Sequence, residues 1–377
     1  MRNMDRFRGC LIGGAVGDAL GYAVEFMRER EIFKRYGPGG ITRYDLVNGC
    51  AQISDDTQMT LFTAAGLLYG QARGVLHQPG EESLSCIRQA YLEWYATQTR
   101  YYPLPADEKR ISWLADRREL FARRAPGTTC MTALRQGGRG TLTHPINDSK
   151  GCGGVMRVAP IGLYFIDNEE WSVEEIDLLG ARAAAVTHGH ELGWLPAAAL
   201  VHIVHALASG RQPDVLSAVE EAMDAMPKVF PKAGYMEDFL AIMEAAVAYS
   251  RQDMDDLTAI HSLGGGWVGE EALAIAVYCA LKYPHDFEKA IIASVNHSGD
   301  SDSTGAVAGN ILGAALGYDA LPAFYLRDLE LKDVILEVAE DLCTELPQQL
   351  RYCSVRLEAE ERRLADRSDE PDDKQKE

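Results

Sequence analysis

Two short acidic clusters carry the residues of this sequence best suited to do chemistry. The first is Ser54-Asp55-Asp56-Thr57, and the second is Gly299-Asp300-Ser301-Asp302-Ser303. Each stands directly before an apolar stretch with helical spacing, where a hydroxyl or one carboxylate can cap the first free N–H groups. Capping accounts for one acid at each place but not for two, since neighbouring carboxylates repel each other unless a cation lies between them. For the first cluster alone, capping and metal binding weigh evenly.

The shared pattern of a hydroxyl and paired acids at two helix starts predicts a joint metal centre. If the fold brings both starts together, six side chains form an all-oxygen cage: Ser54, Asp55, Asp56, Asp300, Asp302 and Ser303. Hard oxygen ligands suit Mg²⁺ or Mn²⁺, and four carboxylates are enough to hold two such ions about 4 Å apart. Zinc fits less well, because His188-Gly189-His190-Glu191 lacks the H-E-x-x-H spacing and no cysteine pair supports it.

Two glycine turns could hold an anion. Gly127 leads into a predicted helix near Thr129, and Gly151-Cys152-Gly153-Gly154 leads into one near Val155. A glycine turn before a helix start exposes backbone N–H groups, which lets an acidic protein bind phosphate without many lysines or arginines. Neither turn is a Walker A loop or a dinucleotide fingerprint. Either one by itself is more often only a turn.

Single residues near these motifs admit more than one role. His188 follows a predicted helix end, where an imidazole either bonds the last carbonyls or lines a pocket. Structural roles are favoured instead for His190, His202 and His205. Glu25 ends an apolar, small-residue helix and is either a surface residue or a carboxylate presented to a cleft. No G-x-S-x-G elbow occurs and Cys152 has no neighbouring base in the sequence, so nucleophilic hydrolysis has little support.

The elements that would position these residues are helices. Apolar residues recur every three or four positions, and few alternating β-branched runs occur. The spacing predicts one all-α, multi-helix domain over residues 1–350, followed by a charged terminal helix and a disordered tail over residues 351–377. Helices are expected over Met4–Phe26, Asp56–Ala72, Glu82–Thr97, Ser112–Arg123, Thr129–Gln136, Val155–Phe165, Val173–Val186, Gly193–Ser209, Asp214–Met226, Met236–Tyr249, Val268–Leu281, Asp286–His297, Asp302–Gly317 and Leu329–Leu346.

Composition narrows the class of protein. The 377 residues include 37 Lys+Arg and 56 Asp+Glu, a formal charge of −19. Binders of nucleic acids and membrane surfaces need a basic surface, so neither partner is expected. The polar start lacks the apolar core of a signal peptide, the eight cysteines form no C-x-x-C pair, and Leu195–Ala208 is too short for a membrane span. We therefore expect a cytoplasmic protein with free thiols.

Ordered motifs along the chain resemble those of the ADP-ribosylglycohydrolase family, which includes the dinitrogenase reductase-activating glycohydrolases. Between residues 9 and 317 they occur in family order: Gly9–Gly21 with Glu25, Ser54–Thr57, Gly153–Pro160, Thr187-His188, Gly266–Ala272 and Gly299–Asp302. The resemblance implies an all-α fold around two Mg²⁺ or Mn²⁺ ions, with the six cage side chains as ligands and Glu25 nearby on a mobile loop. Ser54 and Ser303 stand where many relatives have Thr, and Cys152 replaces a common Asn or Tyr.

The resemblance also implies a substrate and a reaction. The ions would bind the 2- and 3-hydroxyls of the ribose, with His188 beside the same sugar, and the glycine turns would hold the diphosphate. The predicted substrate-binding residues are Gly127, Gly151, Cys152, Gly153, Gly154, His188 and Trp267. Water would attack the anomeric carbon through an oxocarbenium-like transition state. We predict Glu25, Asp56 and Asp302 as the catalytic residues, because a carboxylate beside a metal-bound water is a competent base.

These expectations describe a Mg²⁺-dependent hydrolase of the N- or O-glycosidic bond between ADP-ribose and an acceptor. Arginine on a protein is the first choice of acceptor, and a small-molecule conjugate of ADP-ribose is the other. One alternative is a two-metal phosphohydrolase of a nucleotide-like substrate, which would use the same carboxylates. Another is a catalytically silent relative that binds ADP-ribose or serves a structural role. The four retained Asp residues argue against the silent relative.

Overall fold

Helices form the secondary structure of residues 2–344, the part of the chain that the computed structural model describes. Within this part there is no β-strand, and isolated β-bridges join loop residues. The predicted all-α fold is confirmed, whereas the boundary at residue 350 and the tail over 351–377 lie outside the described residues. The helices are α1 (Met4–Tyr22), α2 (Glu29–Tyr36), α3 (Asp55–Ala72), α4 (Glu81–Thr99), η1 (Trp113–Asp116), η2 (Arg118–Phe121), α5 (Thr128–Arg135), η3 (Cys152–Gly154), α6 (Ala159–Tyr164), α7 (Val173–Ala185), α8 (Glu191–Ala208), α9 (Val215–Val229), α10 (Met236–Ser250), α11 (Asp256–Leu263), α12 (Gly269–Lys282), α13 (Phe287–Val295), α14 (Ser301–Leu316), η4 (Tyr318–Ala320), α15 (Ala323–Arg327) and α16 (Lys332–Thr344).

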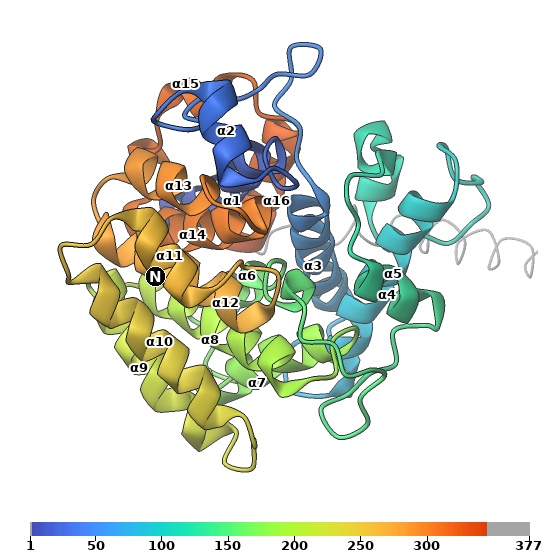
Figure 1. The fold of residues 1–377 in the computed structure, drawn as a ribbon. Coiled ribbons are helices and arrows are strands. Elements are labelled where there is room, and N and C mark those ends of the chain that lie inside the picture. Colours follow the sequence, from blue (N-terminus) through green and yellow to red (C-terminus); the bar gives the residue numbers. More distant parts are fainter. Residues whose placement is uncertain (1, 345–377) are drawn as a thin grey trace, which may run out of the picture.

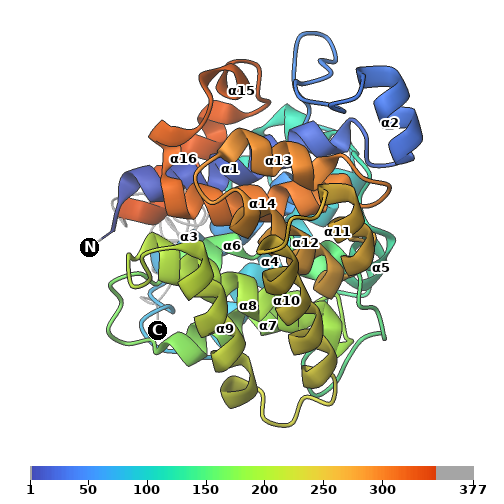
Figure 2. The ribbon, with the colours of Figure 1, turned by 60° about the vertical axis from the view of Figure 1, so that its left-hand side comes forward.

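Helix α8 is buried over nearly its whole length, and α6, α7, α9, α12 and α14 all pack against it. Figure 1 and Figure 2 show α1, α13, α14 and α16 gathered at one end of the molecule, with α9 and α10 as an outer pair at the other. Among the described helices, α8 alone is long and apolar enough to cross a membrane by length and composition. However, 94% of it is buried inside the protein, as is usual for a core helix.

Helices α1 and α14 lie backbone to backbone because each carries a row of small residues. Four-residue spacing aligns the rows on facing sides: Gly9, Gly13, Gly17 and Gly21 on α1, and Ser301, Gly305, Gly309 and Gly313 on α14. A Cβ atom added at Gly17 would lie 1.9 Å from the carbonyl oxygen of Gly305. Because Gly9 near the start of α1 faces Gly313 near the end of α14, and Gly21 faces Ser301, the helices run antiparallel. This pairing brings the turn that carries Glu25 next to the start of α14.

Three predicted helices differ most from the structure. Met4–Phe26 becomes the shorter α1, because two successive tight turns redirect the chain at its end. Ser112–Arg123 is instead the two 3₁₀ helices η1 and η2, since Arg117 between them has an extended backbone. Val155–Phe165 shortens to α6, because Pro160 in the first turn has no N–H with which to extend the helix backward. The first change leaves the segment after α1 as a turn that reaches the site described below.

Three short α-helices were not predicted, namely α2, α11 and α15. Each buries few apolar side chains, so the helical period is weak in its sequence. In α2 only Ile32 is fully buried. That helix has acids in its first turn and bases in its last, which complement the helix dipole.

Candidate active site

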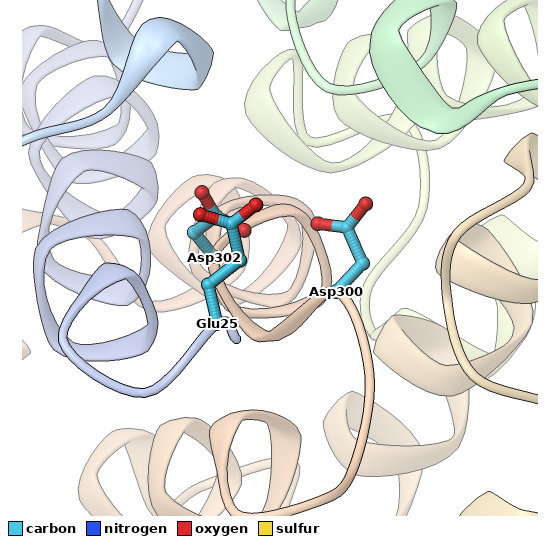
Figure 3. A group of neighbouring side chains, drawn as sticks. All are labelled: Glu25, Asp300 and Asp302. Carbon is cyan, nitrogen blue, oxygen red and sulfur yellow. The ribbon is translucent and has the colours of Figure 1, made fainter. Parts of the chain in front are cut away.

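A cavity of about 500 Å³ lies where the starts of α3 and α14 meet the turn that follows α1. Figure 3 shows the carboxylates of Glu25, Asp300 and Asp302 side by side at the start of α14, and one oxygen of each lies within 4.8 Å of the others. Ser54 is fully buried behind the lining. The fold therefore brings both predicted clusters to one place. The predicted ligands that line the cavity are Asp55, Asp56, Asp300, Asp302 and Ser303.

Helix capping accounts for one member of each cluster. Ser54 is the N-cap of α3, and its Oγ accepts the N–H of Asp56 at 3.2 Å. Asp300 is the N-cap of α14, and its carboxylate accepts the N–H of Ser303 at 3.4 Å. Capping therefore leaves three acids of the two clusters, Asp55, Asp56 and Asp302, whose side chains line the cavity and do not cap a helix.

A sixth carboxylate, which was not predicted as a site residue, supports the first cluster. Asp18 on α1 is fully buried and accepts the backbone N–H of Ser54 at 3.0 Å, the N–H of Thr57 at 3.1 Å and the Thr57 hydroxyl at 2.5 Å. These bonds tie the start of α3 to α1. Burial and the Asp302 charge raise the pKa of Asp18 to about 7. The available signal was an acid in the middle of a glycine-rich apolar helix, where it has no access to solvent.

The cavity gathers negative charge without a basic partner. Burial, and after it repulsion by nearby acids, raises the pKa of Asp55, Asp56 and Asp302 well above the usual range. The same causes raise the pKa of Glu25 to about 10. Glu25 Oε2 and Asp56 Oδ2 are buried without a hydrogen-bond partner, and no Lys or Arg occurs among the described residues that line the cavity. Buried, unpaired carboxylate oxygens of this kind fit hard divalent cations.

Glu25 and Phe26 form a turn at the mouth of the cavity. Glu25 is only 7% exposed and lines the interior, whereas Phe26 is 73% exposed. The Phe26 ring stacks on Trp267, with ring centroids 6.2 Å apart. Trp267 is a predicted substrate residue, and it is itself 46% exposed. Phe26 was not predicted, since an aromatic residue after an acid is no signal by itself; together the two rings offer an exposed apolar surface at the mouth.

The first glycine turn lies on the cavity wall at the start of α5. Gly127 is the N-cap of this helix, and no side chain caps its first turn. The N–H of Gly127 itself donates to Asp55 Oδ2 at 3.2 Å. Thr128 and Thr129 also line the cavity, and their N–H groups belong to the uncapped first turn. An anion here would therefore meet the first turn of α5 rather than the N–H of Gly127.

The second glycine turn places Cys152 against the acidic cluster. Gly151, Cys152 and Gly153 line the cavity, and the Cys152 Sγ lies 2.8 Å from Asp300 Oδ2. Gly154 is buried behind them, where a Cβ atom would lie 2.7 Å from a backbone oxygen of α8. Gly154 thus serves the close packing of the turn on α8.

His188 faces the same turn, and hydrogen bonds connect it to a buried arginine. Buried Arg157 donates to Thr187 Oγ1 at 2.7 Å, and that hydroxyl lies 2.8 Å from His188 Nδ1. The other ring nitrogen, Nε2, faces Gly151. Burial and the Arg157 charge lower the pKa of His188 to about 3, so the imidazole is neutral near pH 7. Arg157 was not predicted as a site residue, although an arginine within an apolar stretch of the sequence could have indicated a buried role.

His190, His202 and His205 have structural contacts, as expected, and none of the three lines the cavity. His190 is the N-cap of α8. His202 Nδ1 lies 2.8 Å from Asp177 Oδ2, and His205 Nδ1 lies 3.0 Å from the carbonyl oxygen of Gly162.

Comparison with known proteins adds a family to this geometry. The sequence model of the family described as ADP-ribosylglycohydrolase matches residues 1–351. The chain belongs to the ADP-ribosylglycohydrolase family. This ADP-ribosylglycohydrolase family member is 28% identical over 340 residues to the ADP-ribosyl-dinitrogen reductase glycohydrolase of Rhodospirillum rubrum. The aligned region covers 87% of this chain and 91% of that relative. The predicted family is thereby confirmed.

More distant relatives of this ADP-ribosylglycohydrolase family member are also hydrolases by name. ADP-ribosylhydrolase ARH3 of Bos taurus is 24% identical, with 87% of this chain and 90% of the relative covered. ADP-ribosylarginine hydrolase Tri1 of Serratia proteamaculans (strain 568) is 22% identical, with coverage of 92% and 81%. A solved structure, an ADP-ribosylglycohydrolase-related protein complex, has a TM-score of 0.57 at 23% identity and covers 90% of this chain and 97% of its own. That structure shows the shared fold.

Proposed function

We propose that this protein is a divalent-cation-dependent hydrolase that releases ADP-ribose from modified arginine side chains of proteins. The observation that carries the proposal is the ring of buried carboxylates around one cavity, two of which have oxygen atoms without partners. Two relatives support the acceptor, since one is named for ADP-ribosyl-dinitrogen reductase and the other for ADP-ribosylarginine.

The acidic cluster would hold the cations. Bound Mg²⁺ or Mn²⁺ would supply positive charge that polarises the ribose hydroxyls and favours the ionised carboxylates. The unpartnered oxygens of Glu25 and Asp56 support this assignment. The side chains that would act as ligands are Ser54, Asp55, Asp56, Asp300, Asp302 and Ser303.

The rest of the cavity wall would hold the remaining parts of the substrate. The uncapped first turn of α5 would bind the diphosphate through its N–H groups. His188, whose Nε2 faces the second glycine turn, would form a hydrogen bond with the sugar or the phosphate. Phe26 and Trp267 would stack on the planar guanidinium of the acceptor, because a delocalised cation is attracted to aromatic faces.

Glu25 is the proposed base of the reaction. Its carboxylate would take a proton from the attacking water while the water oxygen bonds to the anomeric carbon. The bond from that carbon to the guanidinium nitrogen breaks, and its electron pair stays on the nitrogen, which takes up a proton. The products are ADP-ribose and unmodified arginine. Asp56 and Asp302 are the other predicted catalytic residues.

The test offers the purified protein ADP-ribose attached to arginine, serine, an O-acetyl group and DNA bases, each with Mg²⁺, with Mn²⁺ and with EDTA. We expect intact ADP-ribose from the arginine conjugate when a cation is present and no release in EDTA. For Glu25→Gln we expect ADP-ribose binding to persist while turnover becomes slow.

Other products would point to the alternatives. AMP and ribose phosphate in place of ADP-ribose would indicate a two-metal phosphohydrolase. ADP-ribose binding without cleavage of any conjugate would indicate a catalytically silent relative. Release that continues unchanged in EDTA would contradict the cation requirement.

A further inference from the structure

The thiol of Cys152 lies against the acidic cluster, where the predicted cage contained oxygen alone. Cys152 Sγ is 2.8 Å from Asp300 Oδ2, and it also interacts with the Ser303 side chain and with the charge of Asp56. A thiol here differs from the amide of Asn or the phenol of Tyr, the side chains common at this position in relatives. Sulfur is a soft donor, which Zn²⁺ and Cd²⁺ favour as a ligand and Mg²⁺ does not.

A second observation points to a cation at the same place. Glu25 and Asp56 are 7% and 3% exposed, and each has a buried carboxylate oxygen without a hydrogen-bond partner in the cavity that Cys152 lines. One oxygen each from Glu25, Asp300 and Asp302 lies within 4.8 Å of the others. The sulfur therefore contacts Asp300 in the same cavity in which Glu25 and Asp56 present unpartnered carboxylate oxygens.

The backbone holds Cys152 in this position. Its N–H donates to the carbonyl of Trp267 at 3.3 Å, and its own carbonyl accepts the N–H groups of Val155 at 2.9 Å and Met156 at 3.2 Å. A β-bridge joins the preceding Gly151 to the start of α12. The sulfur is thus presented to the acidic cluster by a turn fixed on both sides, as a preorganised ligand would be.

We propose that Cys152 makes one position of this centre a mixed sulfur and oxygen site, which binds a thiophilic divalent ion of the Zn²⁺ or Cd²⁺ class through its sulfur and the Asp300 carboxylate. The thiol proton passes to solvent as the ion binds. The proposal rests on the cation centre of the proposed function and extends it to the choice of metal. An ion held in this way occupies Asp300 and the second glycine turn, so Zn²⁺ and Cd²⁺ displace the catalytic cation and inhibit the enzyme.

The chain offers a matched control in a second cysteine of the same wall. Cys130 also lines the cavity, but its Sγ lies 3.3 Å from the Arg157 guanidinium. A fixed positive charge next to this sulfur disfavours a metal cation there. The two thiols therefore differ in electrostatic surroundings while they share the cavity.

The experiment titrates the metal-stripped full-length chain with Cd²⁺ and follows the ultraviolet sulfur-to-cadmium charge-transfer band. We expect the band in the natural protein and in Cys130→Ser, and its loss in Cys152→Ser. In parallel, electron paramagnetic resonance follows Mn²⁺ bound to each protein. Cd²⁺ is expected to release Mn²⁺ from the natural protein at concentrations that leave Mn²⁺ bound to Cys152→Ser.

Cys152→Asn serves as a second variant if Cys152→Ser does not fold, with helical circular dichroism as the check. A band of undiminished size in the folded Cys152 variant would overturn the proposal. So would a natural protein that gives no band, or one that holds its Mn²⁺ against Cd²⁺. Both readouts are independent of turnover, so a failure to release ADP-ribose would contradict the proposed function and leave this test intact.

Discussion

At the residue scale, Asp302 is a buried carboxylate that would destabilise the metal-free protein and would suit a bound cation. Its side chain is 2% exposed, and its charge contributes to the raised pKa of Glu25, Asp55 and Asp56. A buried carboxylate surrounded by like charges destabilises a fold unless a cation neutralises it. The cluster therefore favours the cation-bound protein over the metal-free one.

The first prediction concerns Asp302→Asn. In EDTA we expect this variant to unfold with a free energy about 1 to 3 kcal/mol above that of the natural protein, because a buried like charge has been removed. Added Mg²⁺ should no longer stabilise it, and turnover should fall roughly 100-fold or more. Denaturant unfolding with and without Mg²⁺, together with ADP-ribose release, measures all three.

Asp319→Asn, at an exposed position, is the control and should change none of these quantities. If Asp302→Asn kept its stabilisation by Mg²⁺ and its turnover, Asp302 would not be a ligand.

Among the elements, the contact between α1 and α14 assembles the site. Their glycine rows let the backbones touch, which places the turn of Glu25 beside Asp300 and Asp302. Asp18 on the same α1 binds the start of α3. One helix thus aligns both acidic clusters.

The second prediction concerns Gly17→Ala. The new methyl group would meet the carbonyl oxygen of Gly305 at 1.9 Å, so the two helices must separate. We expect a loss of about 3 kcal/mol in the free energy of unfolding, at the upper end for an atom forced into a packed core. Cation affinity should fall as well, measured by Mn²⁺ titration. Gly39→Ala is the control, since its methyl group would lie 3.8 Å from Thr42, and equal effects of the two variants would contradict the role of the glycine rows.

A second group of contacts, centred on an ion pair, holds the segment that leads to Asp55. Arg124 and Glu330 form a two-bonded ion pair at 2.5 and 2.8 Å, with side chains 11% and 10% exposed. Arg124 also donates to the carbonyl of Ile53, and Glu330 accepts the N–H of the same residue. The carbonyl of Arg124 accepts the N–H of Asp55 at 3.2 Å. This pair therefore positions the segment that precedes α3.

The third prediction concerns this pair. Arg124→Gln and Glu330→Gln should each lower the free energy of unfolding by about 3 kcal/mol, because each leaves a nearly buried charge unpaired. The double variant should lose less than the sum of the two. Both single variants should also weaken Mn²⁺ binding, as the segment of Asp55 loosens. The exposed pair of Arg100 and Glu108 is the control, and Arg100→Gln should cost less than about 1 kcal/mol; additive losses at the inner pair would refute the coupling.

The whole molecule carries a pH dependence in its buried histidines. Burial lowers the pKa of His188 to about 3, and of both His205 and His297 to about 4, from an ordinary value of 6.5. Between pH 6.5 and 4 the unfolded chain takes up protons that the folded chain does not. The stability that these residues contribute is thus fully present above pH 6.5 and is lost as the pH falls toward 4.

The fourth prediction isolates one of these histidines. His205→Asn keeps a donor near the carbonyl of Gly162 but cannot titrate. Between pH 6.5 and 4 the free energy of unfolding of this variant should fall less steeply than that of the natural protein, by up to about 1.4 kcal/mol per pH unit. Denaturant unfolding at several pH values measures the slopes. His285→Asn, at an exposed site, should leave the slope unchanged, and parallel slopes for His205→Asn and the natural protein would count against the assignment.

For the molecule as a whole, the sequence by itself determined the features that depend on residues a few positions apart in the chain. Long helices such as α3, α8 and α14 follow from apolar spacing, and the two acidic clusters follow from acids paired at helix starts. The family follows from motifs in a fixed order. The helices and clusters can be recognised from the sequence alone because helical hydrogen bonds and caps join residues only two to four positions apart.

Only the tertiary structure decided which distant residues meet. It placed Glu25 in a turn after α1, set the Asp18 carboxylate against the backbone of Ser54, and joined His188 to Arg157 through Thr187. It also placed the Cys152 sulfur on Asp300, nearly 150 residues away in the sequence, at 2.8 Å. The physical reason is that desolvation, charge repulsion and orientation arise from packing between elements, and the glycine rows of α1 and α14 fix that packing.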